Sequence, residues 1–316
     1  MIQIVCDLIV PIKTLIYVNF CFAQCELVFE VYMKFNRKYL NLAAVALFSS
    51  LTLTTLSGCG EKETAKAENA VPETIKIGVV PGPYRPMLDQ YLRPVVEAKG
   101  HKIEFVEFTD WLQPDSALAS GDIDANVFQH QSYLNGIVEN QGLKLSSVVN
   151  IPTLGIFLFS DKFASVDEIA QGASVGIPND PVNLARALRV ARDAKLIGLN
   201  PQKDEQKVSV ADVTDNPYNL QFTTMEAAQL PRSLDSIDLA FVPGNYAYAA
   251  KLDFTKALVA EDVKEPIKLV VAVQDSKVDS IGAFLKEAVL DEKFVQGVDY
   301  DAVFKNFAKP AWWPNK

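Results

Sequence analysis

The apolar positions along the chain recur with two periods in turn, which predicts alternating strands and helices. In some stretches apolar side chains alternate with polar or small ones, as in a half-buried strand. In the stretches between them, apolar side chains share one helical face, and Pro94 within the first such face indicates a kink or an earlier end. The strands expected are 75–79, 103–108 and 123–128, and the helices are 88–96 and 114–120. This order predicts a parallel sheet covered by helices.

The alternation restarts near residue 154 and predicts a second sheet. Asp180 followed by Pro181 is typical of a helix start, with Asp180 as the N-cap. Residues 165–168 fit a capping box and predict a second helix start. The further strands expected are 154–159, 175–177, 220–224, 237–242 and 267–273, with two helices after them. Two α/β lobes, each with its own sheet, account for the 316 residues.

Residues 33–58 have the layout of a secretory signal peptide: a basic start, an uncharged apolar stretch, then small residues. The sequence LSGC ends it at Cys59 and looks like a bacterial lipobox, in which the cysteine is lipidated and becomes the mature N-terminus. The alternative is an ordinary signal peptide with an incidental cysteine. Residues 59–74 then read as a flexible tether.

Residues 1–32 are apolar and precede this complete signal, so we expect a start site assigned too far upstream. The alternative is an extra membrane segment, interrupted by Asp7, Pro11 and Lys13. No cysteine follows Cys59, which excludes an intramolecular disulfide or a cysteine-based zinc site in the mature domain.

Charge and motifs exclude several classes of function. The chain has 39 acidic and 30 basic side chains, a net charge of −9, whereas a nucleic-acid binder needs a basic surface. Nucleophile-elbow, phosphate-loop, dinucleotide and zinc-protease motifs are absent from the sequence, and two histidines exclude a histidine-rich metal site. We therefore expect no catalytic residue, no metal and no cofactor.

The stretch GDIDANVFQHQSYL at 121–134 places three ring side chains where a strand passes into a helix. In an open parallel sheet that edge faces the ligand crevice. Phe128 and Tyr133 can enclose an apolar or thioether side chain, and His130 can supply a polar edge. Alternatively, Phe128 is plain core and His130 only starts a helix.

The stretch IPNDPVNLARAL at 177–188 places Asn183 and Arg186 on one face at the start of a helix. Arg186 can hold a carboxylate through two hydrogen bonds, and the Asn183 oxygen can accept one from an ammonium group. Together they suit an amino-acid backbone. The alternative is a solvated basic stripe, because Arg189 and Arg192 continue the spacing.

These two stretches resemble the NlpA/MetQ family of methionine-binding lipoproteins. The segments NPYNLQF and EAAQLPRSLDSIDLA, the later NYA and the lipobox follow the same pattern, so the resemblance runs from about residue 75 to the C-terminus. It implies an α/β, type II periplasmic-binding-protein fold, with two parallel-rich sheets joined by hinge strands that cross at 154–160 and 267–273. The division expected is a first lobe at 75–158 with 268–316, and a second lobe at 159–267.

The resemblance also implies a set of ligand-binding residues. The family's side-chain pocket corresponds to Trp111, Phe128, His130 and Tyr133, and its contacts to the ligand's carboxylate and amino groups correspond to Arg186 and Asn183.

Two positions depart from the family pattern. Trp111 stands where the family usually has tyrosine, and Pro243 stands where it places a ligand-contacting asparagine. Asn245 lies two residues further on and is a candidate replacement. The segment before Ser160 also lacks the family's usual proline-bearing hinge.

The sequence therefore predicts a lipid-anchored solute-binding protein that delivers an amino-acid-like ligand, methionine or a related small molecule, to an ABC permease and its ATPase. It would lie on the cell membrane and face the periplasm or the cell exterior. Two alternatives are a surface lipoprotein acting as an adhesin or sensor partner with a vestigial pocket, and a lipid-anchored enzyme. The enzyme is disfavoured because a nucleophile and a base are missing.

Overall fold

The computed structural model describes residues 70–314 of the chain. The expected upstream segment, the signal peptide, Cys59 and most of the tether lie outside the described residues. Between residues 70 and 314, no helix has both the length and the apolar composition needed to cross a membrane.

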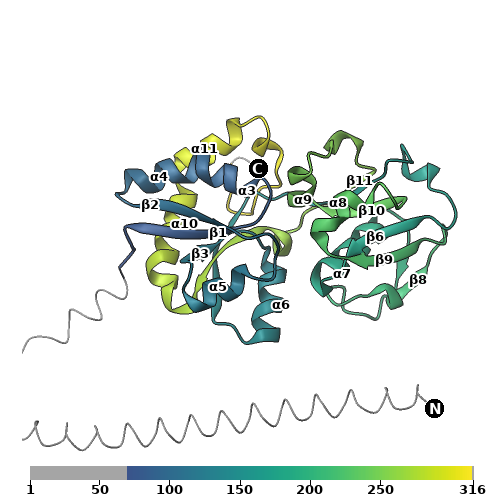
Figure 1. Cartoon of the computed structure of the whole chain (residues 1–316), viewed down its shortest axis with the longest axis horizontal. Helices are drawn as coiled ribbons and strands as arrows, with labels where there is room; N and C mark the ends of the chain where they lie inside the picture. Colours follow the sequence, from purple (N-terminus) through teal and green to yellow (C-terminus); the bar gives the residue numbers. More distant parts are fainter. Residues whose placement is uncertain (1–69, 315–316) are drawn as a thin grey trace, which may run out of the picture. The chain divides into compact units, whose positions relative to one another are not determined.

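The first sheet is mixed and joins strands from both ends of the described chain (Figure 1). In spatial order its strands are β2 (Lys102–Glu107), β1 (Thr74–Val79), β3 (Ala125–Asn126), β12 (Leu269–Gln274) and β4 (Leu145–Ile151). β1 is parallel to β2 and β3, as the β-α-β-α-β order predicts, whereas β12 is antiparallel to β3 and β4. β12, from the returning chain, is therefore one reversed strand inserted between β3 and β4, and the other four strands of this sheet run in the same direction.

Helices cover both faces of this sheet. On one face lie α3 (Tyr84–Met87), the π-helical turn η1 (Leu88–Leu92), α4 (Arg93–Ala98), α10 (Ala283–Leu290) and α11 (Glu292–Tyr300). On the other lie α5 (Pro114–Ser120) and α6 (Gln131–Gln141). Pro94 falls in the first turn of α4, directly after η1, so it marks a change of helix type and not an end.

The second sheet is also mixed. In spatial order its strands are β11 (Val259–Ala260), β5 (Ile156–Phe159), β10 (Leu239–Pro243), β6 (Ser174–Pro178) and β9 (Gln221–Met225). β6 is parallel to β9 and β10, and β5 is antiparallel to β10 and β11. A separate two-stranded ribbon is formed by β7 (Gly198–Leu199) and β8 (Val213–Asp215).

Two apolar clusters sandwich the second sheet. Helix α7 (Pro181–Asp193) packs on one face, and α8 (Leu230–Ser233) and α9 (Gly244–Ala249) pack on the other. Successive side chains of β10 point to opposite faces of the sheet, so Phe241 belongs to the first cluster and Val242 to the second.

Helix starts were predicted with mixed success. Asp180 caps α7 as expected: its Oδ1 accepts from the backbone N–H of Asn183 at 2.8 Å, and Pro181 follows at the first helical position. The helix expected at 165–168 is wrong, because only the 3₁₀ turn η2 (Val166–Glu168) forms there and Ser165 makes no capping bond. The remaining short turns are η3 (Val210–Asp212), η4 (Ala227–Gln229), η5 (Phe254–Lys256), η6 (Glu265–Ile267), η7 (Asp275–Lys277), η8 (Val278–Gly282) and η9 (Phe304–Asn306).

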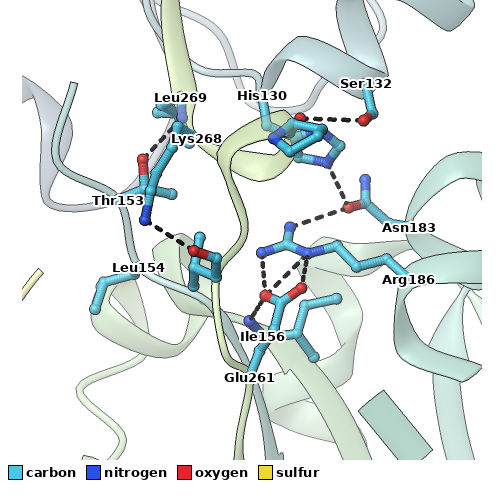
Figure 2. Close-up of polar contacts among 12 residues, drawn as sticks. His130, Ser132, Thr153, Leu154, Ile156, Asn183, Arg186, Glu261, Lys268 and Leu269 are labelled. Carbon is cyan, nitrogen blue, oxygen red and sulfur yellow. Dashed lines mark hydrogen bonds and ion pairs between the residues drawn. The ribbon is translucent and has the colours of Figure 1, made fainter. Parts of the chain in front are cut away.

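The chain passes between the two sheets at residues 152–155 and returns at 261–268. The strands expected to cross, 154–160 and 267–273, contain β5 and β12, and each of these pairs within a single sheet. The crossings themselves are short segments without strand structure, the second of which contains η6. Thr153 Oγ1, in the first crossing, accepts from the backbone N–H of Leu269 at the start of β12, at 2.7 Å (Figure 2). The two-lobed α/β fold is as expected. The lobe limits at 158 and 268 stay a proposal that would divide β5.

Candidate functional site

A small cavity lies where the described strands of both sheets lead into helices. His130 caps the start of α6, Asn183 and Arg186 lie in the first two turns of α7, and Asn245 is the second residue of α9. The cavity holds about 30 Å³. A buried water needs roughly 10–15 Å³ on the same measure, so an amino acid can enter only if walls from the two sheets separate. Its lining is Tyr84, Trp111, Phe128, Gln129, His130, Tyr133, Leu154, Asn183, Arg186, Pro243, Gly244, Asn245 and Leu269.

All seven ligand-binding residues expected from the sequence line this cavity. The aromatic ones form one wall with edge-on contacts: the Tyr133 ring lies 6.2 Å from Phe128 and 6.0 Å from Trp111. Trp111 also stacks against Tyr246 of α9, with ring centroids 5.1 Å apart. Phe128 is therefore part of the cavity wall as well as of a core cluster.

His130 is held in one tautomer by its two neighbours. Its Nδ1 accepts from the backbone N–H of Tyr133 at 3.1 Å, so Nε2 carries the proton and donates to Asn183 Oδ1 at 3.0 Å. Burial, followed by the nearby charge of Arg186, lowers the pKa of His130 to about 3. The ring is therefore neutral at pH 7 and links α6 to α7 (Figure 2).

Arg186 forms a buried ion pair with Glu261, which lies on the returning crossing segment (Figure 2). The Arg186 Nε donates to both Glu261 carboxylate oxygens, at 2.8 and 3.0 Å, and the two side chains are only 6% and 8% exposed. Burial raises the pKa of Glu261, but the charge and hydrogen bonds of Arg186 outweigh it and hold that pKa below its usual range. Glu261 also accepts from the backbone N–H of Ile156, the first residue of β5 after the other crossing.

A solvated basic stripe is therefore the wrong description for Arg186. Arg192 does fit it, since that side chain is partly exposed and pairs with Asp193 and Glu205 at the surface. Arg186 differs because it faces the crossing segments and not solvent.

The oxygen of Asn183 is already bonded to two donors. It accepts from His130 and, at 3.3 Å, from Arg186, while its Nδ2 donates to Asp180 at 3.1 Å. A carbonyl oxygen has two lone pairs, so an ammonium group would compete with these bonds. The contact expected from the sequence stays a prediction.

Asn245 lies in the cavity wall and ties the two lobes together. It is buried, and its Nδ2 donates to the carbonyl of Pro81 at 3.1 Å. Pro243 ends β10 beside it and also lines the cavity. Gly244 is required between them, because a Cβ there would lie 2.5 Å from the Leu154 Cβ.

Sequence reasoning missed three polar cavity or partner residues: Tyr84, Gln129 and Glu261. Gln129 lies inside the stretch that was singled out, but a glutamine beside ring residues carries no signal of its own. Glu261 lies among other charged residues in a segment that resembles a solvated loop, so only the fold reveals its partner. Among residues 70–314, no group of three or more His, Cys, Asp or Glu side chains could hold a metal ion.

The protein has two lobes, each a mixed sheet covered by helices, and two crossings join them. The lobes meet at a cavity that has a buried arginine and aromatic walls. This arrangement defines a two-lobed solute-binding protein. The sequence model of the family described as NlpA lipoprotein matches residues 75–312. The chain belongs to the NlpA lipoprotein family.

Individual relatives agree with this assignment. The D-methionine-binding lipoprotein MetQ of Yersinia pestis is 38% identical over 274 residues, covering 84% of this chain and 93% of the relative. A nutrient-binding protein from Burkholderia cenocepacia, solved bound to methionine, is 34% identical with a TM-score of 0.68, covering 73% of this chain and 97% of that one. A periplasmic substrate-binding protein of an ABC transporter from Coxiella burnetii has a TM-score of 0.69 at 32% identity. The match covers 75% of this chain and 100% of that one.

Family membership confirms the expected class of function. The protein is a membrane-associated lipoprotein and a solute-binding component of ABC import, and it is not an enzyme.

Proposed function

We propose that this protein captures an amino acid or a close derivative in the cavity beside Arg186 and delivers it to an ABC permease and its ATPase. It would be anchored through lipidated Cys59, on the cell membrane, facing the periplasm or the cell exterior. The observation that carries the proposal is the buried guanidinium of Arg186 at a cavity with aromatic walls.

Arg186 has hydrogen-bonding capacity left for a ligand. A guanidinium has five N–H groups, and the bonds to Glu261 and Asn183 use three of them: Nε, one on Nη2 and one on Nη1. The remaining two lie on the Nη1 and Nη2 nitrogens and suit the paired oxygens of a carboxylate. Glu261 fixes the plane of the guanidinium, which reduces the entropy lost when the ligand binds.

The opposite end of the ligand would contact rings. Trp111, Phe128 and Tyr133 offer aromatic faces and edges that suit an apolar or thioether side chain. Relatives described as methionine-binding support a ligand of this size.

We expect L-methionine to bind less tightly than another member of this ligand class. Pro243 has no side-chain polar group and no N–H, so it cannot replace the asparagine that the family resemblance places there. Trp111 adds ring volume over tyrosine at the side-chain end. The expected deficit is about one hydrogen bond to a charged group, ~1.5–3 kcal/mol or roughly ten- to a hundred-fold in affinity.

A thermal-shift panel of L- and D-amino acids, methionine derivatives and dipeptides measures this, because a ligand that binds only the folded protein raises its melting temperature. Calorimetry on the best ligand and on L-methionine then gives the affinity ratio. If L-methionine gives the largest shift and a submicromolar Kd, Pro243 and Trp111 do not change the ligand preference and the prediction is wrong.

Replacing Cys59 with serine should move the protein from the membrane fraction to the soluble fraction. The thiol is the lipid acceptor in the lipobox interpretation, and a hydroxyl would not be lipidated there. Fractionation followed by immunoblotting measures the distribution, and Thr64→Ser serves as the control because it changes the expected tether and leaves the lipobox intact. Sedimentation of Cys59→Ser with membranes would contradict the lipobox or show that residues 1–32 anchor the chain.

A further inference from the structure

We propose that Gln129 is a specificity-determining residue that accepts a hydrogen bond from the ligand's amino group, with Asp115 and Asn126 positioning its amide. This inference rests on the proposed function and names one contact within that same cavity. Gln129 is 3% exposed, it lines the cavity, and its Oε1 is buried without a hydrogen-bond partner among the described residues. A buried acceptor left unpaired is costly, so a donor from the ligand is the natural partner.

The amide of Gln129 has a single favourable orientation. Its Nε2 donates to Asp115 Oδ1 at 2.5 Å and to Asn126 Oδ1 at 3.2 Å. A flipped amide would set Oε1 against these two acceptor oxygens, so the nitrogen stays on that side. Asn126 is itself fixed, because its Nδ2 donates to Asp115 Oδ1 at 2.9 Å. The unpaired oxygen of Gln129 is therefore pre-oriented by its neighbours.

Other side-chain amides around the cavity are less available. The Asn183 oxygen already accepts from His130 and Arg186. Pro243 offers no amide at the position where the family resemblance places one. The remaining candidates are Gln129 and Asn245. Each amide is held through its nitrogen, but the Gln129 oxygen is the one that is buried without a partner, so it gains more from a ligand donor. A shift of the accepting oxygen to Gln129 would also move the amino group, consistent with a preferred ligand other than L-methionine.

Electrostatics favour a cationic group beside Gln129. Asp115 is 3% exposed, and the hydrogen bonds to its Oδ1 come from the neutral amides of Asn126 and Gln129. Burial raises its pKa to about 6, against the lowering effect of its bonds to Asn126 and Gln129, so the carboxyl is mostly ionised at pH 7. Its second oxygen, Oδ2, is also buried and unpaired. A ligand ammonium bound to Gln129 would offset this uncompensated negative charge.

Two ligands that differ only in the amino group test the contact: L-methionine and its des-amino analogue, methylthiobutanoate. Isothermal titration calorimetry at pH 7 compares wild type with Gln129→Met, which keeps the length of the side chain but removes the amide. We expect L-methionine to lose roughly ten- to a hundred-fold in affinity, and the analogue less than threefold, so that the preference for the amino group collapses. Asp115→Asn removes the charge and keeps an acceptor, and it should reduce the same preference by a smaller factor.

Gln274→Met is the matched control. Gln274 also bonds helix α5, through the carbonyls of Leu118 and Ala119, but it does not line the cavity, so its replacement should leave the ratio of the two affinities unchanged. Equal losses for both ligands in Gln129→Met would make Gln129 a structural residue and overturn the inference, as would no loss at all. If the wild type binds neither ligand, the best ligand of the thermal-shift panel and its des-amino analogue replace the pair. A panel in which no amino acid or derivative binds would overturn the proposed function, which is a different outcome from equal losses.

Discussion

Replacing Arg186 with alanine should weaken binding of a carboxylate ligand at least ~30-fold and lower the free energy of unfolding by about 3–5 kcal/mol. Both effects have one cause. The substitution removes the N–H groups available to the ligand, and it leaves the carboxylate of Glu261 buried at 8% exposure without its cationic partner. Glu261 would keep only its bond from the backbone of Ile156.

The double variant Arg186→Ala/Glu261→Ala separates the two effects. Removing both charges abolishes the unpaired carboxylate, so chemical denaturation should show part of the lost stability restored. Calorimetry should show no recovery of affinity, because the carboxylate receptor is still missing. Arg192→Ala on the same helix is the control, since its ion pairs are partly exposed and contribute about 0–1 kcal/mol. Normal ligand affinity in Arg186→Ala would place the site elsewhere.

Acidification from pH 7 to pH 5 should lower the free energy of unfolding through His130 by about 2 kcal/mol. The pKa of His130 is about 3 in the folded protein, against 6.5 for the free side chain. Below pH 6.5, His130 therefore binds a proton in the unfolded chain but stays neutral in the folded protein. Stability is full above pH 6.5 and is lost progressively down to about pH 3.

Urea unfolding of wild type and His130→Gln at the two pH values isolates this contribution. Asp115 acts with the opposite sign, because its folded pKa of about 6 lies above the ordinary 3.8, so its protonation stabilises the fold by about 1 kcal/mol between pH 7 and pH 5. The variant should therefore gain stability on acidification, whereas the wild type should lose it or change little. Parallel pH profiles for the two proteins would mean that His130 titrates normally.

Much of this fold can be predicted from short stretches of sequence, because many helix starts and strands depend on residues close together in the chain. Asp180 and Pro181 specify the start of α7 through a capping bond within three residues, and the period of apolar positions locates β6. β4 was missed, since its sequence LSSVVNI mixes polar residues into a strand that is only partly buried. The family resemblance implies crossing strands at 154–160 and 267–273, but β5 and β12 each pair within one sheet, and an apolar run in the sequence does not show which sheet a strand joins.

The site likewise combines residues that can be predicted from nearby sequence with contacts between distant parts of the chain. Phe128, His130 and Asn183 sit where a strand leads into a helix, and that edge of a sheet is predictable from the order of elements. Glu261 is 75 residues from Arg186, and no local pattern joins them. The orientation of Gln129 likewise depends on Asp115, 14 residues away on a different element. Contacts of this kind depend on how the chain returns, which a single sequence does not specify.

The central claim is that the cavity beside Arg186 holds an amino-acid-type ligand. Mass spectrometry of the full-length protein, purified in detergent from expressing cells under native and then denaturing conditions, tests it most directly. We expect a small molecule with a carboxylate and an amino group, retained by wild type and absent from Arg186→Ala/Glu261→Ala. A bound molecule without a carboxylate, retained equally by the double variant, would contradict it.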